Sequence, residues 1–128
     1  KVFEGLQKGD KAFSMEHITA LRQYHAEIVN ELYGAPTRLE KIERLFGELE
    51  QVATETVYRP EDAELWYDTV VAFGELISTT IISEYLSERY RQLLARYATL
   101  LPHRTATQGR LGRYRRIADS AAQRHETV

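Results

Sequence analysis

The chain has no cysteine, so disulfide bonds and thiolate metal ligands are excluded, and a reducing cytoplasm suits it. Proline and glycine are few, and most of them fall where helices are expected to end. We expect no stretch of about 18 apolar residues, and therefore no membrane span. Lys1-Val2-Phe3 is not the start of a signal peptide. These absences predict a cytoplasmic protein.

What is present is ordinary for a globular domain: 43% hydrophobic and 28% charged residues. A length of 128 residues is enough for one compact domain. The first residue is Lys1 rather than Met, and we expect a piece of a longer protein. Residues 1–128 are therefore interpreted as a single partial domain.

Charge is unevenly spread along the chain. Residues 1–88 hold 8 Lys and Arg against 17 Asp and Glu, a balance of −9, whereas residues 89–128 hold 9 Arg against Asp119 and Glu126, a balance of +7. An arginine-rich tail can bind phosphate or nucleic acid. No aromatic stacking pattern or nucleic-acid motif accompanies these arginines, so we favour a solvated face that pairs with the acidic part, and no nucleic-acid partner.

Apolar residues recur at steps of three and four, which predicts helices. The first runs from Lys1 to about Lys8. The second has Ser14 as its N-cap, with Phe13 and Ile18 as a hydrophobic staple, and ends at Gly34.

A third helix opens at Pro36-Thr37, where Thr37 and Glu40 match a capping box, and ends near Arg59-Pro60. It is expected to pair antiparallel with the helix before it. The predicted fold class is mainly α, a bundle of antiparallel helices.

The longest helix is predicted from about Glu61 to Glu88, buried on most sides because its middle is apolar almost all round. Dense β-branched residues leave a strand at 69–73 as an alternative. We prefer a helix, since large apolar residues recur at helical intervals through it.

After Arg89 the residues around Leu93-Leu94 and Leu100-Leu101 fit a last helix or a short strand. Residues 105–112 are predicted as a loop and 113–124 as a polar helix.

Gly74 and Glu75 interrupt this apolar helix. A charge there is costly unless it is paired or meets a polar ligand, and glycine costs about 1 kcal/mol in a helix interior. Together they suggest a bare backbone beside a small cationic ligand. Spacing alone favours the plainer interpretation, in which Glu75 faces solvent or pairs with an arginine. Asp68 lies seven residues earlier and could form a carboxylate pair with Glu75 on the same face.

Three further stretches and the Gly74–Glu75 segment together resemble the aspartate kinase family. The segment from Tyr67 to Leu86 is similar to the family segment in which Asp and a short apolar run precede Gly-Glu-x-x-Ser-Thr. The upstream stretches that resemble the family's helices are Lys1–Leu6, His25–Leu32 and Ile42–Leu49. The resemblance covers roughly residues 1–88, and its Gly-Glu-x-x-Ser-Thr core is moderately specific.

The resemblance implies an enzyme that transfers the γ-phosphate of ATP to the side-chain carboxylate of L-aspartate, the first step of lysine, threonine and methionine biosynthesis. ATP and Mg²⁺ would serve the full-length enzyme. By analogy Glu75 binds the ammonium group of aspartate, and Gly74 lies beside Glu75 in the same pocket. Ser78 and Thr79 cap or line the pocket, although packing in the core fits both residues equally. No residue of this chain is expected to be catalytic or to bind metal.

The family's Lys-Phe-Gly-Gly-Thr strand, its later Gly-rich nucleotide segment and its regulatory ACT domains do not occur in this sequence. Leu93-Leu94-Ala95-Arg96 lacks the Asp of the family's Asp-x-Arg element. The chain is therefore expected to be the helical part of an α/β amino-acid-kinase domain, inactive alone, with the rest of that domain as partner and homo-oligomers possible.

A rival hypothesis is an all-α ligand-binding or dimerisation domain of a transcription regulator.

The four histidines have no metal-ligand spacing. They are expected to lie at the surface or to have their hydrogen bonds satisfied: His17, His25, His103 and His125.

Overall fold

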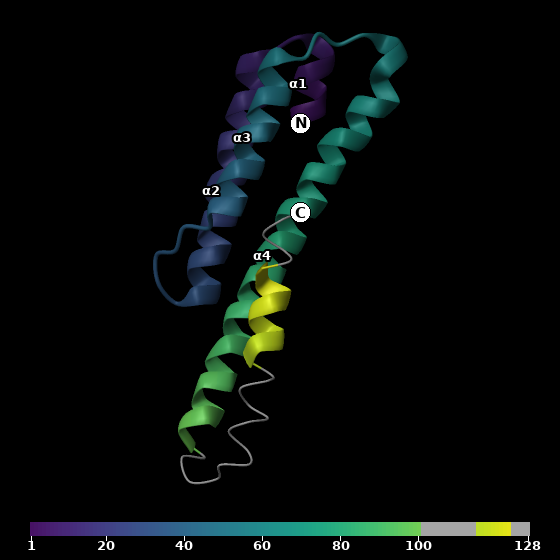
Figure 1. The fold of residues 1–128 in the computed structure, drawn as a ribbon. Coiled ribbons are helices and arrows are strands. Elements are labelled where there is room, and N and C mark those ends of the chain that lie inside the picture. The colour runs from purple at the N-terminus through teal and green to yellow at the C-terminus, as the bar shows by residue number, and fades with distance from the viewer. Residues whose placement is uncertain (101–114, 124–128) are drawn as a thin grey trace. The chain divides into compact units, whose positions relative to one another are not determined.

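The computed structural model describes residues 1–100 and 115–123, and these are built from helices alone (Figure 1). The elements in order are α1 (Val2–Lys8), α2 (Lys11–Tyr33), α3 (Glu40–Glu55), the 3₁₀ helix η1 (Pro60–Asp62) and α4 (Ala63–Leu100). Residues 115–123 are also helical. The prediction of a mainly α chain is confirmed, and the alternative strand at 69–73 is wrong. The predicted loop at 105–112 lies outside the described residues.

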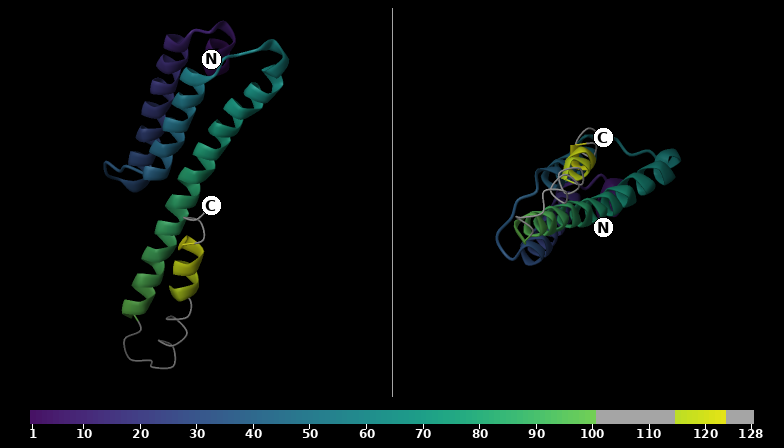
Figure 2. Two further views of the ribbon diagram at one scale, coloured as in Figure 1. Left: turned by 45° about the horizontal axis from the view of Figure 1, so that its top comes forward. Right: turned by 60° about the horizontal axis from the view of Figure 1, so that its bottom comes forward.

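The chain divides into two compact units, Lys1–Ile82 and Ser83–Val128. The first unit holds α1, α2, α3, η1 and the first part of α4. Within it α2 and α3 run antiparallel, joined by the turn that follows Gly34, as both sets of views show (Figures 1 and 2). Contacts are most extensive between α1 and α2 and between α2 and α3, so neighbouring helices in sequence are neighbours in space.

One apolar cluster forms the core of the first unit. Its buried members come from all four α-helices: Val2, Ile18, Val29, Ile42, Phe46, Leu49, Ala53, Ile77 and Ile81. The α3 members recur every three or four residues, which is the spacing from which the helices are predicted. Phe3 adds edge-on ring contacts to Tyr58 and Tyr67, with centroids 6.2 and 5.4 Å apart.

The second helix begins three residues earlier than Ser14, because the side chain of Asp10 accepts a hydrogen bond from the Phe13 N–H (3.0 Å) and caps it. The predicted N-cap role of Ser14 is therefore wrong. Ser14 is fully buried, and its hydroxyl donates to the carbonyl of Val2 at 3.0 Å. A side chain added at Gly5 would collide with this hydroxyl, so glycine allows α1 to approach α2 closely.

The predicted capping box at Thr37 is also wrong. The α3 helix begins at Glu40 after Leu39, and no side chain caps it. The Thr37 hydroxyl donates instead to the Ala35 carbonyl (2.9 Å), and the Thr37 N–H donates to Asn30 Oδ1 (2.8 Å). The turn is thus fixed to α2 rather than to α3.

The fourth helix differs most from prediction. It continues past Glu88 to Leu100, so the expected break near Arg89 is wrong. Burial on most sides is also wrong, because only Ile77 and Ile81 of this helix are fully buried. The stretch Pro60–Leu100 contains 18 consecutive residues with a mean hydropathy of 1.2, and 11% of these residues are buried. By length and composition alone it could cross a membrane, contrary to the expectation that no such stretch exists.

Candidate functional site

The four predicted site residues, Gly74, Glu75, Ser78 and Thr79, lie together within two turns of α4, and all four are exposed. The helix passes through them without a break. The hydroxyl of Thr79 donates to the carbonyl of Glu75 (2.9 Å) and approaches that of Leu76 (3.2 Å). Its proton is therefore used within the helix, and only its lone pairs are left for another molecule.

Helical spacing separates Glu75 from the core. Ile77 and Ile81 point into the core, four residues apart, whereas Glu75 shares its side of the helix with residues three, four and seven positions away. We call this side the Glu75 face and define it by its exposed members: Asp68, Val71, Ala72, Glu75, Ser78, Thr79 and Ile82. Ile82 keeps 56% of its surface exposed. The Glu75 face is thus mixed, with three apolar residues, two carboxylates and two hydroxyl groups.

The Glu75 carboxylate has no cationic partner in residues 1–100 or 115–123: none of the ion pairs found there includes it. The positions three and four residues away are Val71, Ala72, Ser78 and Thr79, none of which carries a positive charge. Glu75 is exposed, which agrees with the solvent-facing alternative that its spacing favours and not with the burial expected for the apolar middle of this helix. The other alternative, an arginine partner, finds no support among these residues.

Gly74 leaves open space beside the carboxylate. A Cβ built there would meet no atom within 4 Å, so nothing in the first unit demands glycine at this position. The same is true of Gly47 on α3, and open space alone therefore does not identify a site. Gly47 likewise precedes an exposed acidic residue, Glu48, that forms none of these ion pairs. The difference is that Glu48 has Arg44 four residues before it, whereas Glu75 has no basic residue three or four positions away.

Two other predicted features are placed by the structure. Asp68, seven residues before Glu75, is exposed on the same side of α4. His17 and His25 each use Nδ1 in a contact with the carbonyl four residues earlier, those of Phe13 and Leu21. Over the described ranges 1–100 and 115–123, no group of three or more His, Asp or Glu side chains is arranged to hold a metal ion.

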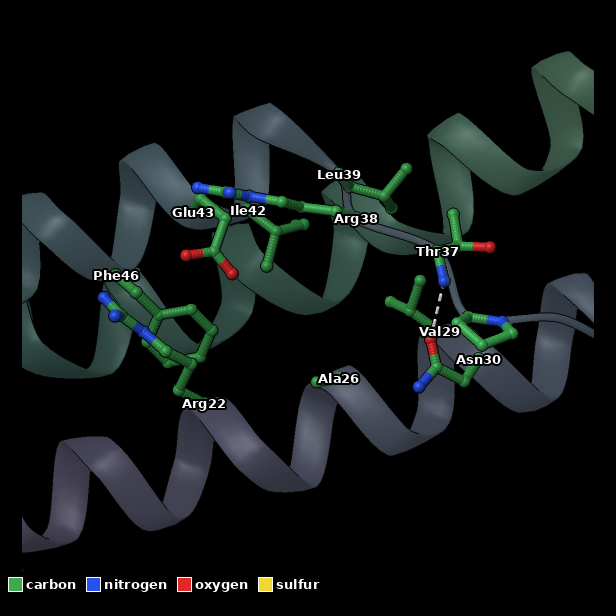
Figure 3. Close-up of a pocket in the computed structure, with 11 residues that line it drawn as sticks. Arg22, Ala26, Val29, Asn30, Thr37, Arg38, Leu39, Ile42, Glu43 and Phe46 are labelled. Atoms are coloured by element: carbon green, nitrogen blue, oxygen red, sulfur yellow. Dashed lines mark hydrogen bonds between the residues drawn. The ribbon is translucent and has the colours of Figure 1, made fainter.

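Sequence reasoning missed a pocket between α2 and α3 (Figure 3). Its charged lining residues are Arg22, Arg38 and Glu43. Each of them looks in the sequence like an ordinary surface residue, with one apolar and one polar neighbour, so no signal in the sequence marks them as a group. They come together only because the turn after Gly34 brings α3 back along α2.

The comparisons with known proteins add no relative. No family model, curated protein or solved structure matches the chain. The resemblance to aspartate kinases therefore rests on the sequence segments given above.

Proposed function

We propose that this chain is part of an aspartate kinase, in which Glu75 binds the ammonium group of L-aspartate while the γ-phosphate of ATP passes to the substrate's side-chain carboxylate. The observation that carries the proposal is the pairing state of Glu75. It is a carboxylate without a cationic partner in the described part of the chain, beside Gly74 and with no basic residue three or four positions away on the helix. A cationic substrate group would supply the missing charge through a charge-assisted hydrogen bond.

In the proposed reaction these residues need only position the substrate. The attacking group is a carboxylate with an ordinary pKa of about 3.9, which is ionised at neutral pH and needs no general base. Phosphoryl transfer then depends on alignment and on neutralisation of phosphate charge by Mg²⁺ and basic residues. The rest of the kinase domain would supply those groups, and the α4 segment would contribute one wall of the aspartate pocket.

The apolar surface around Glu75 supports a protein cover rather than a lipid one. An acidic residue at the centre of a membrane helix costs about 2.5–3.5 kcal/mol, and Glu75 stands inside the apolar segment of α4. In the proposed enzyme the remainder of the kinase domain covers exposed residues such as Leu76 and Ile82. A cytoplasmic enzyme without nucleic-acid partners fits this arrangement.

The test uses the full-length protein and measures aspartate-dependent turnover of ATP. Replacing Glu75 by Gln removes the charge and keeps the shape. We expect the KM for aspartate to rise about 10- to 100-fold, the range for a lost hydrogen bond to a charged group. The matched control is Glu48→Gln, an exposed acidic position on α3, which is expected to leave the KM unchanged.

Two results would refute the proposal at different levels. A full-length protein that turns over no ATP with aspartate present is not an aspartate kinase, and an effector domain of a regulator would then be the better hypothesis. A kinase whose KM for aspartate is the same with Glu75→Gln as with Glu48→Gln keeps the enzyme assignment but removes Glu75 from the substrate pocket.

A further inference from the structure

A pocket of about 380 Å³ lies between the second half of α2, the turn after it and the first half of α3 (Figure 3). We call it the α2–α3 pocket. Its size falls within the roughly 300–1,000 Å³ typical of small-molecule sites. Its apolar lining combines the core residues Val29, Ile42 and Phe46, each 6% exposed or less, with the more exposed Ala26, Pro36 and Leu39. A ligand there would meet a fixed hydrophobic wall rather than mobile surface side chains.

Two opposite charges at the α3 end of the pocket are unpaired. Arg38 and Glu43 both line it, and neither forms an ion pair or side-chain hydrogen bond with any residue that the structure describes. Five positions separate them, so they are not the i, i+4 partners that usually pair along a helix. Both charges therefore remain available to a ligand.

Arg22, in contrast, is held in place as part of the wall. Its Nη2 lies 2.7 Å from Glu50 Oε1, and its guanidinium carbon lies 5.5 Å from the centroid of the Phe46 ring. Its Nε is closed off from solvent and has no hydrogen-bond partner among the described residues. The charge of Arg22 is thus balanced by Glu50, and the charges left for a ligand are one positive and one negative.

The pocket is also formed in advance of binding. The hydrogen bond from the Thr37 N–H to Asn30 Oδ1 (2.8 Å) fixes the turn to α2, and Arg38 follows directly in the chain. Asn30 comes from the same helical turn as Val29, so one anchor fixes both the polar end and the apolar wall. A preformed site loses less conformational entropy on binding than one that must be assembled.

We propose that the α2–α3 pocket binds a free α-amino acid with an aliphatic side chain. Arg38 takes the carboxylate, Glu43 takes the ammonium group, and the side chain packs against Val29 and Ile42. A simple anion is disfavoured because Glu43 would repel it, and a simple cation is disfavoured by Arg38. A zwitterion satisfies both charges at once. The pocket lies on α2 and α3 and shares no residue with the Glu75 face, so this inference does not depend on the proposed kinase activity.

The experiment is an NMR titration of the 128-residue chain, with methyl-labelled Val and Ile, using L-leucine as the probe. We expect saturable shifts of the Val29 and Ile42 methyl signals. Two analogues test the zwitterion directly: 4-methylpentanoate lacks the amine and 3-methylbutylamine lacks the carboxylate. Each is expected to bind at least about tenfold more weakly than leucine, equivalent to about 1.4 kcal/mol per lost charge contact.

Variants test the two charges from the side of the protein. Arg38→Gln and Glu43→Gln are each expected to weaken leucine binding about tenfold. The controls are Arg44→Gln and Glu48→Gln, exposed α3 positions that do not line the pocket, and these should bind leucine as the parent chain does. Circular dichroism of each variant checks that the helices are retained.

Three outcomes would overturn the proposal. One is that leucine causes no saturable shift up to its solubility limit. Another is that either analogue binds as tightly as leucine, which would make the site one for a simple anion or cation. The third is that Arg38→Gln and Glu43→Gln bind leucine no differently from their controls.

Discussion

We expect Gly5→Ala to destabilise the chain, although alanine is the better helix former. A Cβ at this position collides with the buried hydroxyl of Ser14, and it also lies 3.0 Å from the backbone N of Ser14 and the carbonyl of Asp10. Backbone atoms cannot rotate away, so α1 must shift from α2. Overpacking of this kind costs about 1–3 kcal/mol.

Two smaller contributions nearly cancel. Alanine gains about 1 kcal/mol over glycine in a helix interior. The shift of α1 breaks the 3.0 Å hydrogen bond from the Ser14 hydroxyl to the Val2 carbonyl, which contributes about 0.5–1.5 kcal/mol. The net expectation is a loss of about 1–3 kcal/mol in the free energy of unfolding, measured by urea denaturation followed by circular dichroism.

Gly47→Ala is the matched control, because Gly47 also lies inside a helix but has no atom within 4 Å of an added Cβ. It is expected to stabilise the chain by up to about 1 kcal/mol. The sign of the change thus separates the two glycines. If Gly5→Ala is as stable as the parent, the close approach of α1 to α2 described here is wrong.

A double-mutant cycle locates the clash. Ser14→Ala removes the hydroxyl that the new methyl group meets, so Gly5→Ala should cost less in the Ser14→Ala background than in the parent. Residues in contact usually couple by about 0.5–3 kcal/mol in such cycles. Additive changes would mean that the two positions do not touch.

Three further predictions concern α4 and the first two helices. Gly74→Ala is expected to stabilise the isolated chain by about 1 kcal/mol in urea, because nothing meets its Cβ, yet to raise the KM for aspartate in the proposed full-length kinase. Asp10→Ala removes the cap on the Phe13 N–H and should cost about 1 kcal/mol in the same assay. The hydrogen bond from Lys8 and the charge of Lys1 lower the pKa of Glu4, so its stabilising contribution is present above the unfolded pKa and is lost as the pH falls through the folded pKa. Lys8→Gln should raise the pKa of Glu4 in an NMR pH titration.

Each of these has a clear contrary result. A Gly74→Ala variant less stable than the parent would mean that some contact at this position is missing from the description of α4. An unchanged unfolding free energy for Asp10→Ala would place the start of α2 elsewhere. A Glu4 pKa that does not respond to Lys8→Gln would remove the hydrogen bond as its cause.

The helices could be predicted from the sequence because apolar periodicity is local information. The buried residues of α3 (Ile42, Phe46, Leu49 and Ala53) show this spacing of three and four residues. The caps could not be predicted, because several polar side chains near a helix start could each accept a hydrogen bond from its free N–H groups. Ser14 fits an N-cap pattern, but in the structure it is buried and Asp10 caps the helix instead.

The candidate site could be predicted only in part, for a different physical reason. Periodicity predicts the helix that carries Glu75, but it does not say which side of the helix is covered. A run of apolar residues predicts burial in either case, whether the surface that covers it belongs to the same chain or to another part of a larger protein. The α2–α3 pocket could not be predicted at all, since it depends on the path of the turn that Asn30 fixes.

The pairing of α1 with α2 and of α2 with α3 also bears on how the chain acquires its structure. Proteins rich in contacts between sequence neighbours fold within microseconds to milliseconds, since little loop-closure entropy opposes them. We therefore expect the first three helices to assemble on the ribosome as they emerge, before α4 has been synthesised. The apolar α4 would then meet a template that is already folded, which shortens the time during which it could aggregate.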